Sequence, residues 1–171
     1  MQTDALLLGI KNRLALAIAT GLGVGYSPVA PGTVGSFIGI LLIFLLSRWQ
    51  FIEGQRVIVH WLVVAVISAI GIWAASRAEV ILAKRDPPQV VIDEIVGQLL
   101  TFGLIFRNPR VNLLFLGFLF FRFFDIVKPP PVRQIDAKLG GGAGVILDDS
   151  MAGIYGLAVM HGLYWLNGGW W

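Results

Sequence analysis

The sequence predicts an all-α membrane protein, in which about five transmembrane or partly re-entrant helices follow an N-terminal interfacial helix. Of the 171 residues, 57% are hydrophobic and only 13% are charged, whereas soluble domains carry about 25% charged residues. The charges also gather in short connections between apolar stretches, as in multi-pass membrane proteins. The length suits one domain, so we expect residues 1–171 to form a single membrane-embedded unit.

The first two predicted helices differ in how they meet the membrane. The first twenty residues place Lys11 and Arg13 among leucines and alanines, which favours a helix lying in the membrane interface. No charged residue follows until Arg48, but prolines and a glycine at 28–32 interrupt the apolar run. Because proline breaks a helix interior, we expect the next helix to cover about Thr33 to Ser47.

Two segments have the length of a full crossing. Val57 to Ser76 contains twenty residues without a charge, and twenty helical residues rise about 30 Å, the thickness of the hydrocarbon core. The final segment, Ser150 to about Leu166, is also uncharged and carries Trp165 near its end, a residue type that favours the membrane interface. Both segments are predicted to cross the membrane.

Two middle segments are shorter. Ile95 to Phe106 and Val111 to Phe124 flank a turn at 107–110, so they suit a tight helical hairpin. Each has about 12 to 14 apolar residues, fewer than the roughly 20 that an unassisted crossing needs. They cross only if their polar ends are drawn to the headgroup level, and the alternative is a re-entrant hairpin.

Five crossings would place the N-terminal region and the connections 77–94 and 125–149 on one side of the membrane. That side collects nine of the thirteen basic residues, and the positive-inside bias makes it cytoplasmic. The same side carries all three acidic segments. The nine basic residues are Lys11, Arg13, Arg77, Lys84, Arg85, Arg122, Lys128, Arg133 and Lys138.

Acidic side chains border the apolar segments at three places on this side. They are Asp86 with Asp93 and Glu94, then Asp125, then Asp136 with Asp148 and Asp149. A carboxylate beside hydrocarbon is costly unless it is paired, hydrated or bound to a cation, and Mg²⁺ takes carboxylate, water and phosphate oxygens. We therefore predict a Mg²⁺ site facing lipid headgroups, with ligands from Asp93, Glu94, Asp125, Asp148 and Asp149. Because neighbours on a helix point about 100° apart, Asp93 and Glu94 are not expected to face one ion side by side.

A stripe of alternating charge accompanies the second acidic segment. Arg122, Asp125 and Lys128 occur at every third position, which places them along one face of a helix. In one interpretation Asp125 binds the metal while Arg122 and Lys128 hold phosphate oxygens. The alternative is an internal ion pair that neutralises a charge at the interface.

The segment 27–36 joins a proline turn to a helix start. We expect Thr33 to cap the helix. The free N–H groups of a helix start, together with the hydroxyls of Thr33 and Ser36, suit a phosphate. A capped helix that only enters the membrane explains the segment equally well. Glycines at 140–144 are expected to form a flexible loop that leads to Asp148 and Asp149 at the start of the last span.

Four blocks carry a resemblance to a known family: SPVAPGTVGS (27–36), VVIDEIVGQ (90–98), FRFFDIVKPPPVRQID (121–136) and GGGAGVILDDSMAGIY (140–155). In this order they resemble the phosphatidylglycerophosphatase A family of bacterial membrane enzymes. The resemblance implies Mg²⁺-dependent removal of the terminal phosphate from phosphatidylglycerophosphate in phospholipid biosynthesis, in the bacterial cytoplasmic (inner) membrane. The partners would then be this anionic phospholipid and membrane lipids. We assign the catalytic roles to Glu94, Asp125 and Asp149.

Composition argues against other classes. A net charge of only +3, with the basic residues in connections, argues against nucleic-acid binding. The absence of cysteine excludes disulfides and thiolate metal sites. His60 and His161 lie in apolar spans without a second histidine at catalytic spacing, so we expect packing or interhelical hydrogen-bond roles. Two alternatives stay open: a phosphatase of a different lipid phosphate, and an ion-coupled transporter. The sequence indicates no oligomeric state.

Overall fold

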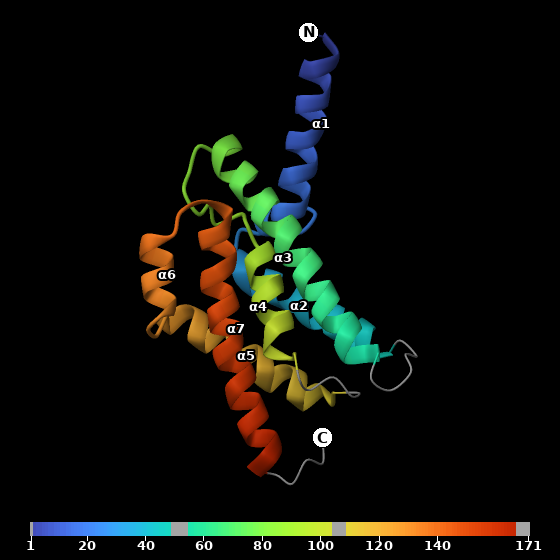
Figure 1. Cartoon of the computed structure of the whole chain (residues 1–171), viewed down its shortest axis with the longest axis vertical. Coiled ribbons are helices and arrows are strands. Elements are labelled where there is room, and N and C mark those ends of the chain that lie inside the picture. Colours follow the sequence, from blue (N-terminus) through green and yellow to red (C-terminus); the bar gives the residue numbers. More distant parts are fainter. Residues whose placement is uncertain (1, 49–54, 104–108, 167–171) are drawn as a thin grey trace.

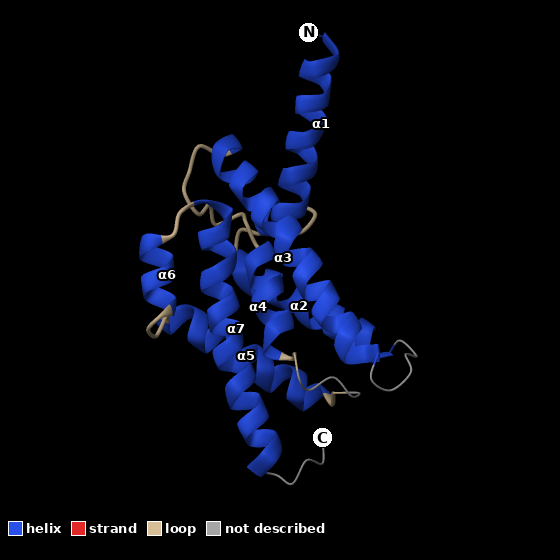
Figure 2. Cartoon of the chain, viewed as in Figure 1, coloured by secondary structure: helices blue, strands red, loops and turns tan. Residues whose placement is uncertain are grey.

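The chain folds into helices joined by short connections (Figures 1 and 2), as seen in a computed structural model that describes residues 2–48, 55–103 and 109–166. No strand occurs in this described part, which confirms the all-α fold class. The elements are α1 (Gln2–Ala19), the short 3₁₀ helix η1 (Val24–Tyr26), α2 (Pro31–Arg48), α3 (Gln55–Ile81), α4 (Ile92–Thr101), α5 (Val111–Val127), α6 (Val132–Lys138) and α7 (Gly141–Leu166).

The short helix α4 forms the centre of the bundle. Nine of its ten residues are buried, and it packs mainly against α7 and α2, with further contacts to α3 and α5 (Figure 1). Because neighbouring helices cover α4 on every side, its apolar residues Val96 and Leu99, and Phe102 just after it, are fully buried. This burial positions Asp93 and Glu94, in the first turn of α4, inside the protein.

Glycines bring the backbones of α4 and α7 into contact. A Cβ on Gly153 of α7 would overlap the carbonyl oxygen of Gly97, and a Cβ on Gly97 would lie 2.7 Å from the carbonyl oxygen of Asp149. Small residues allow such close approach of membrane helices. The glycines therefore set how near α7 carries Asp149 to the first turn of α4.

Three helices in the described part are long and apolar enough to cross a membrane, namely α2, α3 and α7. The ten residues of α4 rise only about 15 Å, half of a hydrocarbon core. Five full crossings are therefore not confirmed: α4 and α5, which correspond to the two short predicted segments, are not among the three candidate spans. Residues 104–108, which contain the first half of the predicted hairpin turn at 107–110, lie outside the described residues.

Two helices begin earlier than the sequence indicates. Helix α2 begins at Pro31 instead of Thr33, as suits proline at the first helical position, so Thr33 is not the capping residue. Helix α7 begins at Gly141 instead of Ser150, and the predicted flexible glycine loop is wrong. Gly142 is helical because it packs on α3: its N–H donates to Ser76 Oγ (3.0 Å), and a Cβ there would overlap the carbonyl oxygen of Ile72.

Helix α1 projects from the bundle at its N-terminal half (Figure 1). Its C-terminal half packs against α3, with Ala15 and Ala19 fully buried. Leu6, Leu7 and Ile10 are more than half exposed. Apolar side chains that no other part of the described chain covers suit contact with lipid, so the interfacial position of this helix stays our prediction.

Candidate active site

One pocket of about 410 Å³ gathers the polar segments of the chain. Its walls are the start of α2, the connection between α3 and α4, the first turn of α4, the end of α5 and one turn of α7. Residues far apart in sequence thus meet at one end of the bundle. Two of the three predicted acidic segments contribute all their carboxylates to this pocket, and the third contributes Asp148 and Asp149, while the side chain of Asp136 lies outside the described side chains.

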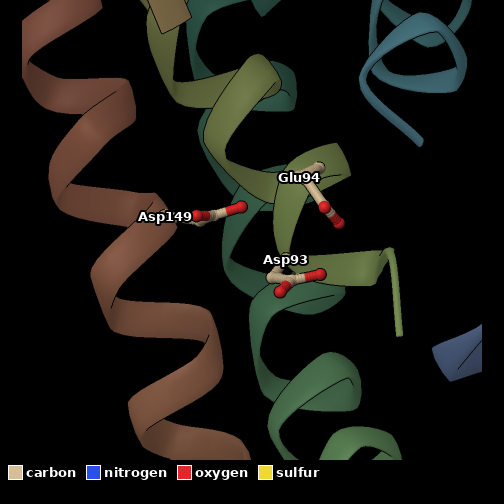
Figure 3. Close-up of side chains that lie close together, drawn as sticks. All are labelled: Asp93, Glu94 and Asp149. Atoms are coloured by element: carbon tan, nitrogen blue, oxygen red, sulfur yellow. The ribbon is translucent and has the colours of Figure 1, made fainter. Parts of the chain in front are cut away.

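Three carboxylates come together in the wall of this pocket. Asp93, Glu94 and Asp149 each place one oxygen within 4.8 Å of the others. Figure 3 shows Asp149 pointing from α7 toward α4, which carries the other two side chains. In the described part of the chain, Asp93 Oδ1, Glu94 Oε2 and Asp149 Oδ2 are buried and have no hydrogen-bond partner. Buried charged oxygens without partners are unusual and call for a ligand.

Asp93 and Glu94 approach each other more closely than the expectation for neighbouring helical positions suggests, in a cluster that includes Asp149. Both side chains leave the first turn of α4, where helical side chains lean toward the N-terminus. One oxygen of each lies within 4.8 Å of the other, so the 100° between their Cβ directions does not separate their oxygens.

Asp125 completes this group of carboxylates. It lies close enough to Asp149 to share a hydrogen bond when one of the two is protonated. It also forms an ion pair with Arg122, whose Nη1 lies 2.6 Å from Asp125 Oδ2. The sequence interpretation of an internal pair one turn apart on α5 is therefore correct for these two residues.

Burial and mutual repulsion disfavour the charged forms of these groups. Removal from water raises the pKa of the Asp93 carboxyl well above its usual range, and the charges of Glu94 and Asp149 raise it further. Burial also raises the pKa of Glu94, although a hydrogen bond from Asp93 opposes this. A cation among the carboxylates would remove the repulsion, which is the electrostatic argument for a metal at this position.

Lys128 does not continue the predicted stripe along α5. The helix ends at Val127, and Lys128 adopts the left-handed conformation (φ 46°). Its ammonium therefore turns to α7 and pairs with Asp148, at 2.8 Å from Nζ to Oδ2. Asp148 is also held by the backbone N–H of Asp149, which donates to Asp148 Oδ1 (2.9 Å). Asp148 and Lys128 thus form an ion pair beside the three-carboxylate group.

The start of α2 lies against the carboxylates. A Cβ on Gly32 would overlap Glu94 Oε1 and would lie 3.3 Å from Arg122 Nη1, so a larger residue at this position would require both side chains to shift. Thr33 lines the pocket, as predicted for a phosphate ligand. Ser36 does not: it is fully buried, and its Oγ donates to the carbonyl oxygen of Gly32 one turn earlier. The prediction of a phosphate contact from Ser36 is therefore wrong.

The connection between α3 and α4 supplies pocket residues for which the sequence predicts no individual role. Lys84, Asp86 and Pro87 line the pocket. The sequence indicates Lys84 only as one of the nine basic residues on the predicted cytoplasmic side, and Asp86 only as a member of the first acidic segment. The sequence signal that could have found these pocket residues is the run of three charged residues followed by two prolines at 84–88. Binding residues are often found on connecting segments, and the prolines restrict the conformation of this one.

Fold and site together define a membrane-embedded helical protein with a pocket of carboxylates and basic side chains at one end of its bundle. Comparison with protein families then narrows the class. The family model described as phosphatidylglycerophosphatase A matches residues 17–164. The chain belongs to this family and is a phosphatase.

Curated relatives agree with the family. The chain is 30% identical to phosphatidylglycerophosphatase A of Escherichia coli, over 91% of this chain and 90% of the relative. It is 33% identical to the protein of the same name from Haemophilus influenzae, over 87% of this chain and 88% of the relative. A third relative, from Bacteroides thetaiotaomicron, is 37% identical over 91% of this chain and 96% of its own length, and bears the name "Putative phosphatidylinositol-3-phosphatase". No solved structure matches the chain.

Proposed function

We propose that this phosphatase removes the terminal phosphate from phosphatidylglycerophosphate, with Mg²⁺ bound by Asp93, Glu94 and Asp149. The observation that carries the proposal is the meeting of these three carboxylates with the start of α2 in one pocket. The names of the Escherichia coli and Haemophilus influenzae relatives support the substrate. The ion-coupled transporter is set aside because the chain belongs to a phosphatase family.

The residues present fit a Mg²⁺ ion. All three candidate ligands are carboxylates, the ligand type that this hard cation prefers, and Mg²⁺–oxygen distances of about 2.1 Å allow two ligand oxygens to lie at most about 4.2 Å apart. The observed oxygens lie within 4.8 Å of one another, so small side-chain movements bring them into range. Bound there, Mg²⁺ would polarise the phosphate and lower the pKa of a bound water. Asp125 and Asp148 are the further candidate ligands.

The remaining pocket residues suit the phosphate. The start of α2 contributes Gly32 and Thr33 to the pocket wall, and the first N–H groups of a helix, together with a hydroxyl, favour anions. Arg122 has a planar fork that matches phosphate oxygens, while Lys128 provides a point charge. Each of these two side chains is already paired with a carboxylate, which holds it in place. The two cations would stabilise the negative charge that develops on the equatorial oxygens of the phosphate during the reaction.

Proton handling falls to the carboxylates. Asp125 is next to Asp149 and is oriented by Arg122, so Glu94, Asp125 and Asp149 are the candidates for accepting a proton from an attacking water or for attacking phosphorus. The phosphoester bond to the lipid then breaks, and the leaving glycerol oxygen takes up a proton.

The site is assigned to the cytoplasmic face of the bacterial inner membrane. The support is the positive-inside bias: Arg77, Lys84, Arg85, Arg133 and Lys138 lie in or beside the connections at the pocket end of the bundle. The substrate's phosphate would then reach the pocket from the leaflet that faces these basic residues.

Phosphate release from purified protein tests the activity. Detergent micelles of phosphatidylglycerophosphate are incubated with Mg²⁺, with EDTA, and with EDTA followed by excess Mg²⁺. We expect turnover only in the first and third conditions. Turnover that persists in EDTA would exclude the metal role, and no turnover in any condition would exclude the substrate.

A second substrate is tested alongside the first. The Bacteroides thetaiotaomicron relative is 37% identical to this chain, and its name refers to a 3-phosphate on phosphatidylinositol. Both lipids carry a phosphomonoester beyond a phosphodiester. The ratio of kcat/KM values on the two lipids decides which headgroup this chain serves.

A further inference from the structure

The connection between α3 and α4 forms one wall of the pocket and has no part in the proposed hydrolysis. Within it, Ala83 (φ 51°) and Asp86 (φ 44°) both adopt the left-handed conformation. Residues with a Cβ avoid this region, and such conformations persist only where surrounding contacts hold them, most often at functional sites.

Contacts from two directions hold this connection. Glu79 of α3 accepts the backbone N–H of Asp86 at its Oε1 (2.9 Å) and the backbone N–H of Lys84 at its carbonyl oxygen (3.1 Å). Arg85 Nη2 donates to the carbonyl oxygen of Leu139, just before α7 (3.1 Å). The connection is therefore fixed to both α3 and the α6–α7 junction, and Lys84 lines the pocket as a result.

The charges of the pocket single out Lys84. Three basic residues line the pocket, and two of them, Arg122 and Lys128, are paired with carboxylates. Among the described side chains no carboxylate pairs with Lys84, which is exposed. A cation held at the pocket by a strained connection is thus available for an anion that the described protein does not supply.

Lys84 and the carboxylates also belong to different walls of the pocket. Lys84 is exposed and comes from the connection before α4, whereas Asp93 and Asp149 are buried side chains of α4 and α7. A pocket of about 410 Å³ has the size of sites that hold whole ligands. One phosphate at the carboxylates therefore leaves the rim beside Lys84 for a second group.

We infer that Lys84 binds the phosphodiester of the substrate headgroup while the terminal phosphomonoester lies at the carboxylates. Lys84 is then a specificity-determining residue, which selects lipids that carry both phosphates over lipids with a monoester alone. The inference rests on the proposed lipid-phosphatase function. A lysine suits the role because its flexible point charge needs no bidentate geometry on a singly charged diester.

The test compares two phosphorylated amphiphiles in phospholipid-free detergent micelles. Phosphatidylglycerophosphate carries both phosphates, and hexadecyl phosphate carries only a monoester and is used as a competitive inhibitor. We expect Lys84→Gln to raise KM for phosphatidylglycerophosphate about tenfold, the loss of one charged hydrogen bond, with kcat and the Ki of hexadecyl phosphate within about twofold of wild type. Lys84→Arg should restore most of the KM. The matched control is Lys138→Gln, an exposed lysine at the end of α6 that does not line the pocket.

Each contrary outcome has one meaning. An unchanged KM in Lys84→Gln, or an equal rise in KM and in the Ki of hexadecyl phosphate, overturns the diester contact while leaving the proposed function standing. A KM effect that appears only after phosphatidylglycerol is added assigns Lys84 to neighbouring lipids and also overturns it. Absence of wild-type turnover overturns the proposed function itself, and the inference with it.

Discussion

At the residue scale, ion pairs divide the carboxylates of the pocket into two groups. Asp125 and Asp148 are each held by a basic residue, Arg122 and Lys128 respectively. Asp93, Glu94 and Asp149 keep buried oxygens without hydrogen-bond partners in the described part of the chain. Paired carboxylates support the site, whereas carboxylates with unsatisfied buried oxygens are suited to bind a cation.

This division predicts unequal effects for two adjacent aspartates. Asp149→Asn should lower kcat on the order of 100-fold, because it removes a candidate ligand and proton acceptor. Asp148→Asn should lower kcat less and lower the melting temperature more, because it leaves Lys128 without its buried partner. Phosphate release and thermal unfolding are measured on the same detergent samples. Mg²⁺ should raise the melting temperature of Asp148→Asn but not of Asp149→Asn, and equal responses would contradict the division.

Substitutions of Arg122 distinguish two roles for this residue, phosphate binding and support of Asp125. If it grips phosphate, Arg122→Gln should fold normally and lose catalysis, and Arg122→Lys should recover only part, because a point charge cannot reproduce the fork. If it serves only Asp125, Arg122→Gln should lose stability on the order of a few kcal/mol. Melting temperature and activity per folded molecule distinguish the two. A large fall in melting temperature with unchanged activity would leave the arginine structural.

At the element scale, the site depends on how closely α7 approaches α4. Gly97 and Gly153 allow the two backbones to touch, and Asp149 lies one turn before Gly153 on α7. A shift of α7 away from α4 would therefore move Asp149 away from Asp93 and Glu94. The sequence does not indicate which residue each of these glycines contacts.

Two glycines of α7 provide a matched test of this contact. Gly153→Ala should destabilise the protein by about 1–3 kcal/mol, because its methyl group overlaps the backbone of α4, and should also lower activity by moving Asp149. Gly162→Ala is the control, since a Cβ there meets nothing within 4 Å and alanine favours the helix. Circular dichroism melting and phosphate release are compared. A Gly153→Ala protein as stable and active as the control would show that the close approach is dispensable.

At the scale of the whole molecule, the helices place every pocket segment at one end. Helix α7 runs from this end to the opposite end of the bundle (Figure 1). Its last residue, Leu166, is exposed. The described structure thus gives the protein two distinct ends, and the positive-inside bias orients the pocket end to the cytoplasm.

Cysteine labelling tests this orientation in a chain that has no native cysteine. Arg133→Cys, on the exposed surface of α6 at the pocket end, should react with an impermeant thiol reagent only after spheroplasts are lysed. Leu166→Cys, at the far end of α7, should react in intact spheroplasts. Both variants are first checked for phosphate release. The reverse labelling pattern would place the pocket on the outer face.

The membrane class, the helical fold, the family and the carboxylates of the site could be predicted from the residues alone, because hydrophobicity, charge position and ordered motifs are local properties of the chain. Which side chains meet followed only from the packing of the helices. The tertiary structure brought Asp93 and Glu94 to one point, turned Lys128 from Asp125 to Asp148, withdrew Ser36 onto its own helix and added Lys84 to the pocket. These outcomes follow from where α5 ends, how closely α4 and α7 pack and how the connection before α4 is held. Such features depend on contacts between distant segments, which the spacing of residues along one helix does not contain.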